Sequence, residues 1–149
     1  MARSAGASKA YCTNELAMFQ TQSKIISQLS RQGSCIFVDR CADYMPRNQP
    51  NVFRVFVHAD KQGRVRRVVE DYGVVGAAYA SGLIDAIDRN RAAYYHKYTQ
   101  RTWGESSNYG MTLSSDELGI STCIVLLAEA ITSSSQSMLP FRLTVIEPT

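Results

Sequence analysis

Basic side chains that could bind phosphate stand beside the predicted ends of strands. Arg40 directly follows the run CIFVD. Arg64 and Arg67 lie three residues apart near the start of a predicted helix, and Asp88 and Arg91 share that spacing on a longer helix. Open α/β sheets bind ligands beyond the carboxyl ends of their strands, and arginine forks hold phosphate oxygens bidentately. Arginines that converge from separate segments therefore suit a phosphoryl-transfer site.

The opposing interpretation is that these residues belong to ordinary solvated helix faces. Asp85 and Arg89, four residues apart, look like a surface ion pair of little energetic consequence. The run IDRNRAAYYHKYTQRTWG, residues 87–104, adds tyrosines and the only tryptophan to its basic residues. Bases could stack on those rings, but tyrosines at helical spacing are more often core residues. We therefore keep an RNA-binding module as a weaker alternative and do not expect nucleic acid as a partner.

The composition is that of one globular domain. The chain has 149 residues, of which 45% are hydrophobic and 19% charged, and its net charge is +3. This length can bury a core, and the mild charge does not by itself indicate nucleic-acid binding. No apolar run approaches the ~20 residues that span a bilayer, and the first residues contain no apolar core of a signal peptide. These features predict a cytoplasmic protein without a membrane partner.

The cysteines and histidines do not form a metal-binding pattern. The four cysteines show no C-x-x-C spacing, and the chain has only two histidines, so no zinc site is predicted. Cys35 and Cys123 lie in apolar runs and are expected to behave as small buried hydrophobes. His58, at the end of a strand-like run, is expected to be structural.

Helical and strand-like patterns alternate along the chain. Helices are predicted at residues 14–30, 60–73, 77–100 and 116–132. Strands are predicted at residues 34–40, 52–59 and 109–115, and the first of these is apolar enough to be buried. This order predicts an α/β fold with a mostly parallel sheet. We expect a lead-in at residues 1–13, a domain at 14–131, and a serine-rich linker with a strand-like tail at 132–149.

Local signals set the expected limits and faces of the helices. Thr13 or Asn14 could cap the first helix, Asp60 the second and Asp116 the last. On the helix 77–100, four residues form a predicted core stripe: Leu83, Ile87, Tyr94 and Tyr98.

From about residue 14 to residue 131 the sequence resembles the cytidylate kinase-like family of bacterial nucleoside monophosphate kinases. The resemblance is carried by SCIFVDRCADYMPRNQPNVFRVFVHAD, RVRRVVEDYG and DRNRAAYYHKYTQRTWGESSNYGMTLSSDELGI. The most specific parts are RCADY, RAAYYHKYT and WGESSNY. The resemblance implies a P-loop kinase-like three-layer fold, here partial. It also implies ATP-dependent phosphoryl transfer to a nucleoside monophosphate such as CMP, with ATP and Mg²⁺.

The resemblance also implies roles for individual residues. Arg40 matches an arginine that closes a core strand and faces the monophosphate. Asp88 and Arg91 match a pair that holds the acceptor nucleotide, which makes Arg91 the catalytic candidate. Arg64 and Arg67 match arginines on the ATP side, at the start of the helix that leads to the lid.

The sequence departs from this family at the phosphate-binding loop. No G-x-x-x-x-G-K-[ST] motif or glycine–serine-rich variant occurs, and SAGASKA, residues 4–10, has one glycine and no strand before it. Asp39 stands where the family usually has glycine, and its carboxylate would compete with a phosphate bound at Arg40. We therefore expect no appreciable kinase activity from this chain alone.

A central strand of the family fold is also missing from the matched region. Strands 34–40 and 52–59 would flank an empty position and leave backbone groups unpaired. The tail segment FRLTVIE could fill it, but its alternating polarity suits a half-exposed strand better. We therefore expect a homo-oligomer in which a partner chain closes the gap. A non-catalytic module that self-associates stays open beside the kinase-like function.

Overall fold

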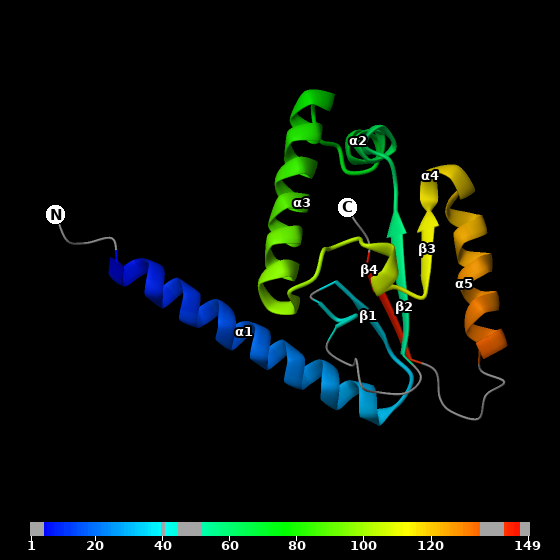
Figure 1. The fold of residues 1–149 in the computed structure, drawn as a ribbon. Helices are drawn as coiled ribbons and strands as arrows, with labels where there is room; N and C mark the ends of the chain where they lie inside the picture. Colours follow the sequence, from blue (N-terminus) through cyan, green and yellow to red (C-terminus); the bar gives the residue numbers. More distant parts are fainter. Residues whose placement is uncertain (1–4, 40, 45–51, 135–141, 147–149) are drawn as a thin grey trace.

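All the strands described by the computed structural model lie in one parallel sheet. The structure describes residues 5–39, 41–44, 52–134 and 142–146. The strands are β1 (Ile36–Val38), β2 (Val52–His58), β3 (Met111–Ser114) and β4 (Arg142–Ile146). They form a four-stranded sheet in the order β1-β4-β2-β3, with every pair parallel. Helices alternate with these strands, so the predicted α/β fold with a parallel sheet is confirmed (Figure 1).

The tail strand β4 fills the gap in the middle of the sheet. It pairs with β1 on one side, where Phe37 faces Thr144, and with β2 on the other, where Phe53 faces Leu143. The prediction that a partner chain closes this gap is therefore wrong. Each buried backbone group left unpaired costs about 1–3 kcal/mol, and pairing along both edges of β4 removes that cost. This gain outweighs the preference of an alternating sequence for a half-exposed position.

Five α-helices and one short 3₁₀ helix accompany the sheet in the described part of the chain. They are α1 (Ala5–Gln32), α2 (Lys61–Glu70), α3 (Ala77–Thr99), η1 (Ser106–Asn108), α4 (Ser115–Leu118) and α5 (Ile120–Ser134). None of those helices is both long and apolar enough to span a bilayer. Figure 1 shows α1 extending away from the sheet, while α5 lies beside β3 at the opposite side.

Several predicted helix ends differ from the observed ones. The helix α1 begins at Ala5, so Thr13 and Asn14 lie inside it and not at its start as predicted. The predicted last helix is divided at Gly119, where φ is 76°, and the residue that caps α4 is Ser114 and not Asp116. Glycine adopts this positive φ without strain, which permits the break. By contrast, Asp60 caps α2 as predicted, because its Oδ1 accepts the Gly63 N–H at 2.6 Å.

The core is centred on β2 and α3. Buried side chains include Val55 and Phe56 of β2 and Ala80 and Ile84 of α3. The predicted α3 stripe is displaced by one residue, because Leu83 is 37% exposed and Ile84 is buried in its place. Two adjacent stripes of α3 are both apolar, so periodicity alone could not choose between them.

Two tyrosines of the predicted stripe, Tyr94 and Tyr98, are half-buried and contact α1. Phe19 of α1 stacks on Tyr98 with ring centroids 4.2 Å apart and meets Tyr94 edge-on at 6.4 Å. These tyrosines thus hold α1 against α3.

The prediction of a fully buried strand at residues 34–40 is wrong, because Ile36 is 67% exposed and Val38 is 58% exposed. The reason is position, since β1 is at the end of the strand order.

Candidate functional site

Polar side chains follow three of the four strands at their carboxyl ends. Asp39 directly follows β1, Asp60 lies two residues beyond β2, and Ser115 and Asp116 follow β3. Parallel strands bring their carboxyl ends to one edge of the sheet, which is where α/β folds bind ligands. The side chains at this edge fall into three groups.

The first group surrounds a pocket of about 410 Å³ between α1, α3 and the end of β1. Its lining combines charged, amide and aromatic side chains: Glu15, Asp39, Cys41, Asn90, Arg91, Ala93, Tyr94, Tyr95, Lys97 and Trp103. The volume is within the range of small-molecule sites. Of the four predicted site residues that the structure describes, only Arg91 lines this pocket.

Arg91 carries a carboxylate competitor in this pocket. Its Nε lies 3.4 Å from Asp39 Oδ2, and both side chains are partly exposed. Asp39 has a φ of 62°, a left-handed conformation that aspartate tolerates better than most residues. The Asp39 carboxylate thus contacts Arg91. Its expected competition with phosphate at Arg40 stays a prediction. Arg40 itself is outside the described residues.

A second ion pair and an aromatic wall complete the pocket. Lys97 Nζ donates a hydrogen bond to the Glu15 carboxylate, which raises the pKa of Lys97. Trp103 meets the ring of Phe56 edge-on, with centroids 5.8 Å apart. The pocket therefore offers two cations, each next to a carboxylate, and a flat ring surface.

A buried polar contact holds the loop after β1 against α3. Tyr95 Oη donates to Asp43 Oδ2 at 2.6 Å, and Arg54 Nε donates to the Asp43 backbone carbonyl, also at 2.6 Å. Burial raises the pKa of Asp43, and burial together with the hydrogen bond to Asp43 raises that of Tyr95. Burial also raises the pKa of Tyr109 to about 12. Sequence reasoning missed Asp43 as a site-forming residue, although an acidic residue inside the specific run RCADY was a signal.

The second group is an ion pair between Arg64 and Asp88. The resemblance assigned Arg64 to ATP and Asp88 to the acceptor nucleotide. Arg64 Nη1 and Nη2 donate to the two Asp88 carboxylate oxygens at 2.6 and 2.8 Å. Arg64 is buried, being 8% exposed. Neither residue lines the pocket of Arg91. The spacing of Asp88 and Arg91 therefore does not bring both side chains to one cavity.

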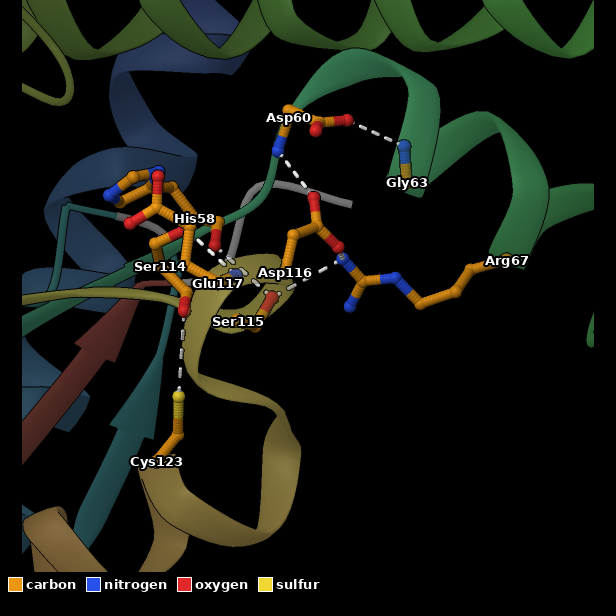
Figure 2. A network of polar contacts seen from close by, with 9 residues as sticks. All are labelled: His58, Asp60, Gly63, Arg67, Ser114, Ser115, Asp116, Glu117 and Cys123. Atoms are coloured by element: carbon orange, nitrogen blue, oxygen red, sulfur yellow. Dashed lines mark hydrogen bonds and ion pairs between the residues drawn. The ribbon is translucent and has the colours of Figure 1, made fainter.

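The third group links α2 to the start of α4, directly after β3, as Figure 2 shows. Arg67 Nη2 donates to Asp116 Oδ1 at 3.1 Å and to Ser115 Oγ at 3.2 Å. The other Asp116 oxygen accepts the Asp60 N–H at 2.6 Å, and Ser115 Oγ donates to the His58 carbonyl at 3.1 Å. Asp116 is therefore an acceptor that ties the ends of β2 and β3 together, a role that its sequence position did not indicate.

Two observations concern the ATP and Mg²⁺ that the resemblance implied. Both arginines matched to the ATP side, Arg64 and Arg67, are engaged by carboxylates. Within the described ranges, no three His, Cys, Asp or Glu side chains are grouped so that they could hold a metal ion. Cys123 is buried as expected, Cys35 is only half-buried, and the His58 ring stacks on Phe56.

Comparisons with known proteins place the chain in a family. No curated protein matches it. The crystal structure of an uncharacterized protein from Eubacterium ventriosum has the same fold, with a TM-score of 0.70 and 24% sequence identity. The match covers 80% of this chain but 65% of that one, so the chain spans less than two thirds of that protein. A sequence model of the cytidylate kinase-like family matches residues 1–117, which include the predicted lead-in. The chain belongs to the cytidylate kinase-like family.

Proposed function

We propose that this chain is a nucleoside monophosphate kinase-like protein whose pocket at Arg91 binds the phosphate of a nucleoside monophosphate such as CMP. The observation that carries the proposal is the position of Arg91 in a pocket of about 410 Å³ at the carboxyl edge of the sheet. An arginine there supplies the charge and the fork geometry that phosphate recognition requires. Family membership supports the nucleotide class of the ligand.

Phosphate binding in this pocket would proceed by exchange of partners. The ligand's oxygens take the place of the Asp39 carboxylate on the Arg91 guanidinium, and Lys97 lies in the same lining as a second cation. Trp103 provides a ring face against which a base can pack. The Tyr95–Asp43 hydrogen bond keeps the loop after β1 in place and so supports the pocket wall.

We further propose that this chain alone does not transfer phosphate. The sequence contains no glycine-rich cradle for the donor phosphates. The arginines matched to the ATP side are held by Asp88 and Asp116. ATP and Mg²⁺ would need groups beyond those that the described residues offer.

One observation favours a second function, a non-catalytic module. The central position of the sheet is taken by β4, a segment from the end of this chain. In the kinases that the sequence resembles, that position belongs to the strand that leads into the P-loop. A sheet completed in this way would keep the fold and the acceptor pocket without the donor site.

Titrations with CMP and with inorganic phosphate test the pocket. Trp103, the only tryptophan, lines it, so its fluorescence reports binding directly. Arg91→Ala should weaken binding by about 1.5–3 kcal/mol, the usual value for a charge-assisted hydrogen bond. Arg89 is exposed on the same helix and does not line the pocket. The variant Arg89→Ala should therefore bind like the wild type. Asp39→Asn should bind more tightly, because it removes a competing carboxylate.

Each part of the proposal has its own contrary result. Equal weakening of binding in Arg91→Ala and Arg89→Ala, or no binding by the wild type, would contradict the proposed phosphate site at Arg91. The catalytic part is tested by following ADP release from ATP, Mg²⁺ and CMP. Turnover at about 1–100 per second, the normal range of kinases, would overturn the proposed inactivity while leaving the pocket in place.

A further inference from the structure

The pocket at Arg91 contains a second ion pair, which joins two helices. Lys97 of α3 donates a hydrogen bond to the Glu15 carboxylate of α1, and both residues line the pocket. Their side chains are 43% and 42% exposed, so a ligand in the pocket can reach them. Placing the phosphate at Arg91 leaves this pair to another part of the ligand.

Arg91 and Lys97 are held in different directions. They are six residues apart on α3, which separates their backbones by ~9 Å along the helix axis. The Arg91 side chain lies near Asp39, directly after β1, whereas that of Lys97 is bonded to α1. The pocket therefore has two polar ends, and the end at Arg91 is the one that suits a phosphate.

The residues around Lys97 form one face of α3, which is turned to α1. Asn90, Tyr94 and Lys97 have the spacing i, i+4, i+7, which places them on the same side of a helix. Tyr94 meets Phe19 of α1 edge-on and Lys97 bonds to Glu15, so this side faces α1. All three α3 residues line the pocket. Its second end thus combines an amide, an ion pair and an aromatic ring.

We infer that this end of the pocket binds the base of the nucleotide through Asn90, Glu15 and Lys97. The assignment rests on the proposed function, because the phosphate must first be placed at Arg91. The edge of a nucleobase carries hydrogen-bond donors and acceptors side by side. The Glu15 carboxylate can accept a hydrogen bond from such an edge, and Lys97 has further N–H donors besides the one it gives to Glu15. The ring of Tyr94 can pack against the face of the base.

Charge selects a neutral group over a second phosphate at this end. The Glu15 carboxylate would repel an anion, and its direct hydrogen bond from Lys97 offsets the charge of the lysine. The Asp39 contact at Arg91 is longer, at 3.4 Å, and is therefore more easily exchanged for a phosphate. A base edge can bond to Glu15 and Lys97 without separating them. The pocket should thus prefer a nucleoside monophosphate to a nucleoside bisphosphate.

Calorimetry with CMP and with ribose 5-phosphate, which lacks the base, tests this assignment. The double variant Glu15→Met with Lys97→Met removes both polar groups and leaves the net charge unchanged. It should bind ribose 5-phosphate like the wild type but CMP about tenfold more weakly, the effect of losing one or two hydrogen bonds. Arg91→Ala should weaken the binding of both ligands by the same factor. The matched control is Lys61→Met with Asp85→Met, an exposed ion pair outside the pocket, which should bind both ligands like the wild type.

The contrary results separate the base site from the proposed function. Equal weakening of both ligands in the double variant of Glu15 and Lys97 would assign Lys97 to the phosphate and overturn the base site. Unchanged binding of CMP by that variant, or a wild type that binds CMP no more tightly than ribose 5-phosphate, would overturn it as well. In these cases the phosphate site at Arg91 stays in place. Binding of neither ligand by the wild type would overturn the proposed function and the base site together.

Discussion

Arg64 and Asp88 form a bidentate ion pair that connects α2 to α3, with N–O distances of 2.6 and 2.8 Å. The Arg64 side chain is 9% exposed and that of Asp88 is 27% exposed. Removing one member of such a pair leaves the charge of the other without compensation in a largely buried place. The pair therefore matters more for the stability of the helix packing than for a ligand.

Replacement of Asp88 by alanine should lower the free energy of unfolding by about 1.5–3 kcal/mol, the value of a hydrogen bond to a charged group. Urea denaturation measures the change. Asp85→Ala on the same helix is the control, since Asp85 forms an exposed ion pair with Lys61. The prediction that Asp85 pairs with Arg89 is wrong. Exposed ion pairs contribute little, so the control should be close to the wild type. Equal losses in both variants would contradict a special role for the buried pair.

Gly63→Ala should destabilise the chain although alanine is the better helix former. A Cβ at Gly63 would overlap both carboxylate oxygens of Asp116, which hold the Asp60 N–H and Arg67. Overpacking of this kind typically costs about 1–3 kcal/mol. Gly82→Ala in α3 is the matched control, because a Cβ there meets no atom within 4 Å. That control should gain up to about 1 kcal/mol from helix propensity, and thermal unfolding that ranks the two variants in the opposite order would refute the prediction.

The buried carboxyl of Asp43 should make stability fall as the pH rises. Burial raises its pKa above the usual 3.8, so the folded chain keeps this proton at a pH where the unfolded chain has lost it. The free energy of unfolding therefore decreases between pH 3.8 and the raised pKa, and this contribution is constant above that window. Asp43→Asn has no proton to lose, so its stability relative to the wild type should increase with pH.

Urea denaturation at several pH values measures this difference. Tyr95→Phe serves as the control for Asp43→Asn. The hydrogen bond from Tyr95 lowers the Asp43 pKa, so its removal raises that pKa further. The decline in stability should therefore persist in Tyr95→Phe and extend to higher pH. A stability difference between Asp43→Asn and the wild type that does not change with pH would show that Asp43 does not titrate in this way.

Features that depend on neighbours in the sequence could be predicted well. The helix predicted at residues 77–100 is α3 at Ala77–Thr99, and the strand predicted at 52–59 is β2 at Val52–His58. The Asp60 cap is confirmed. It could be predicted because its acceptor, Asp60, and its donor, Gly63, lie only three residues apart. Such contacts are formed within one turn of helix, and their residue types are visible in a short window.

The sheet and the candidate site were decided by contacts between distant residues. Tyr95 and Asp43 lie 52 positions apart, Arg64 and Asp88 24 apart, and β4 enters the sheet from the far end of the chain. The sequence shows that Asp88 and Arg91 share a helix, but α2 draws Asp88 to Arg64 while Arg91 turns to the pocket beside Asp39. Charge pairing and strand pairing depend on which groups the whole fold brings within a few ångströms, and local spacing does not contain that information.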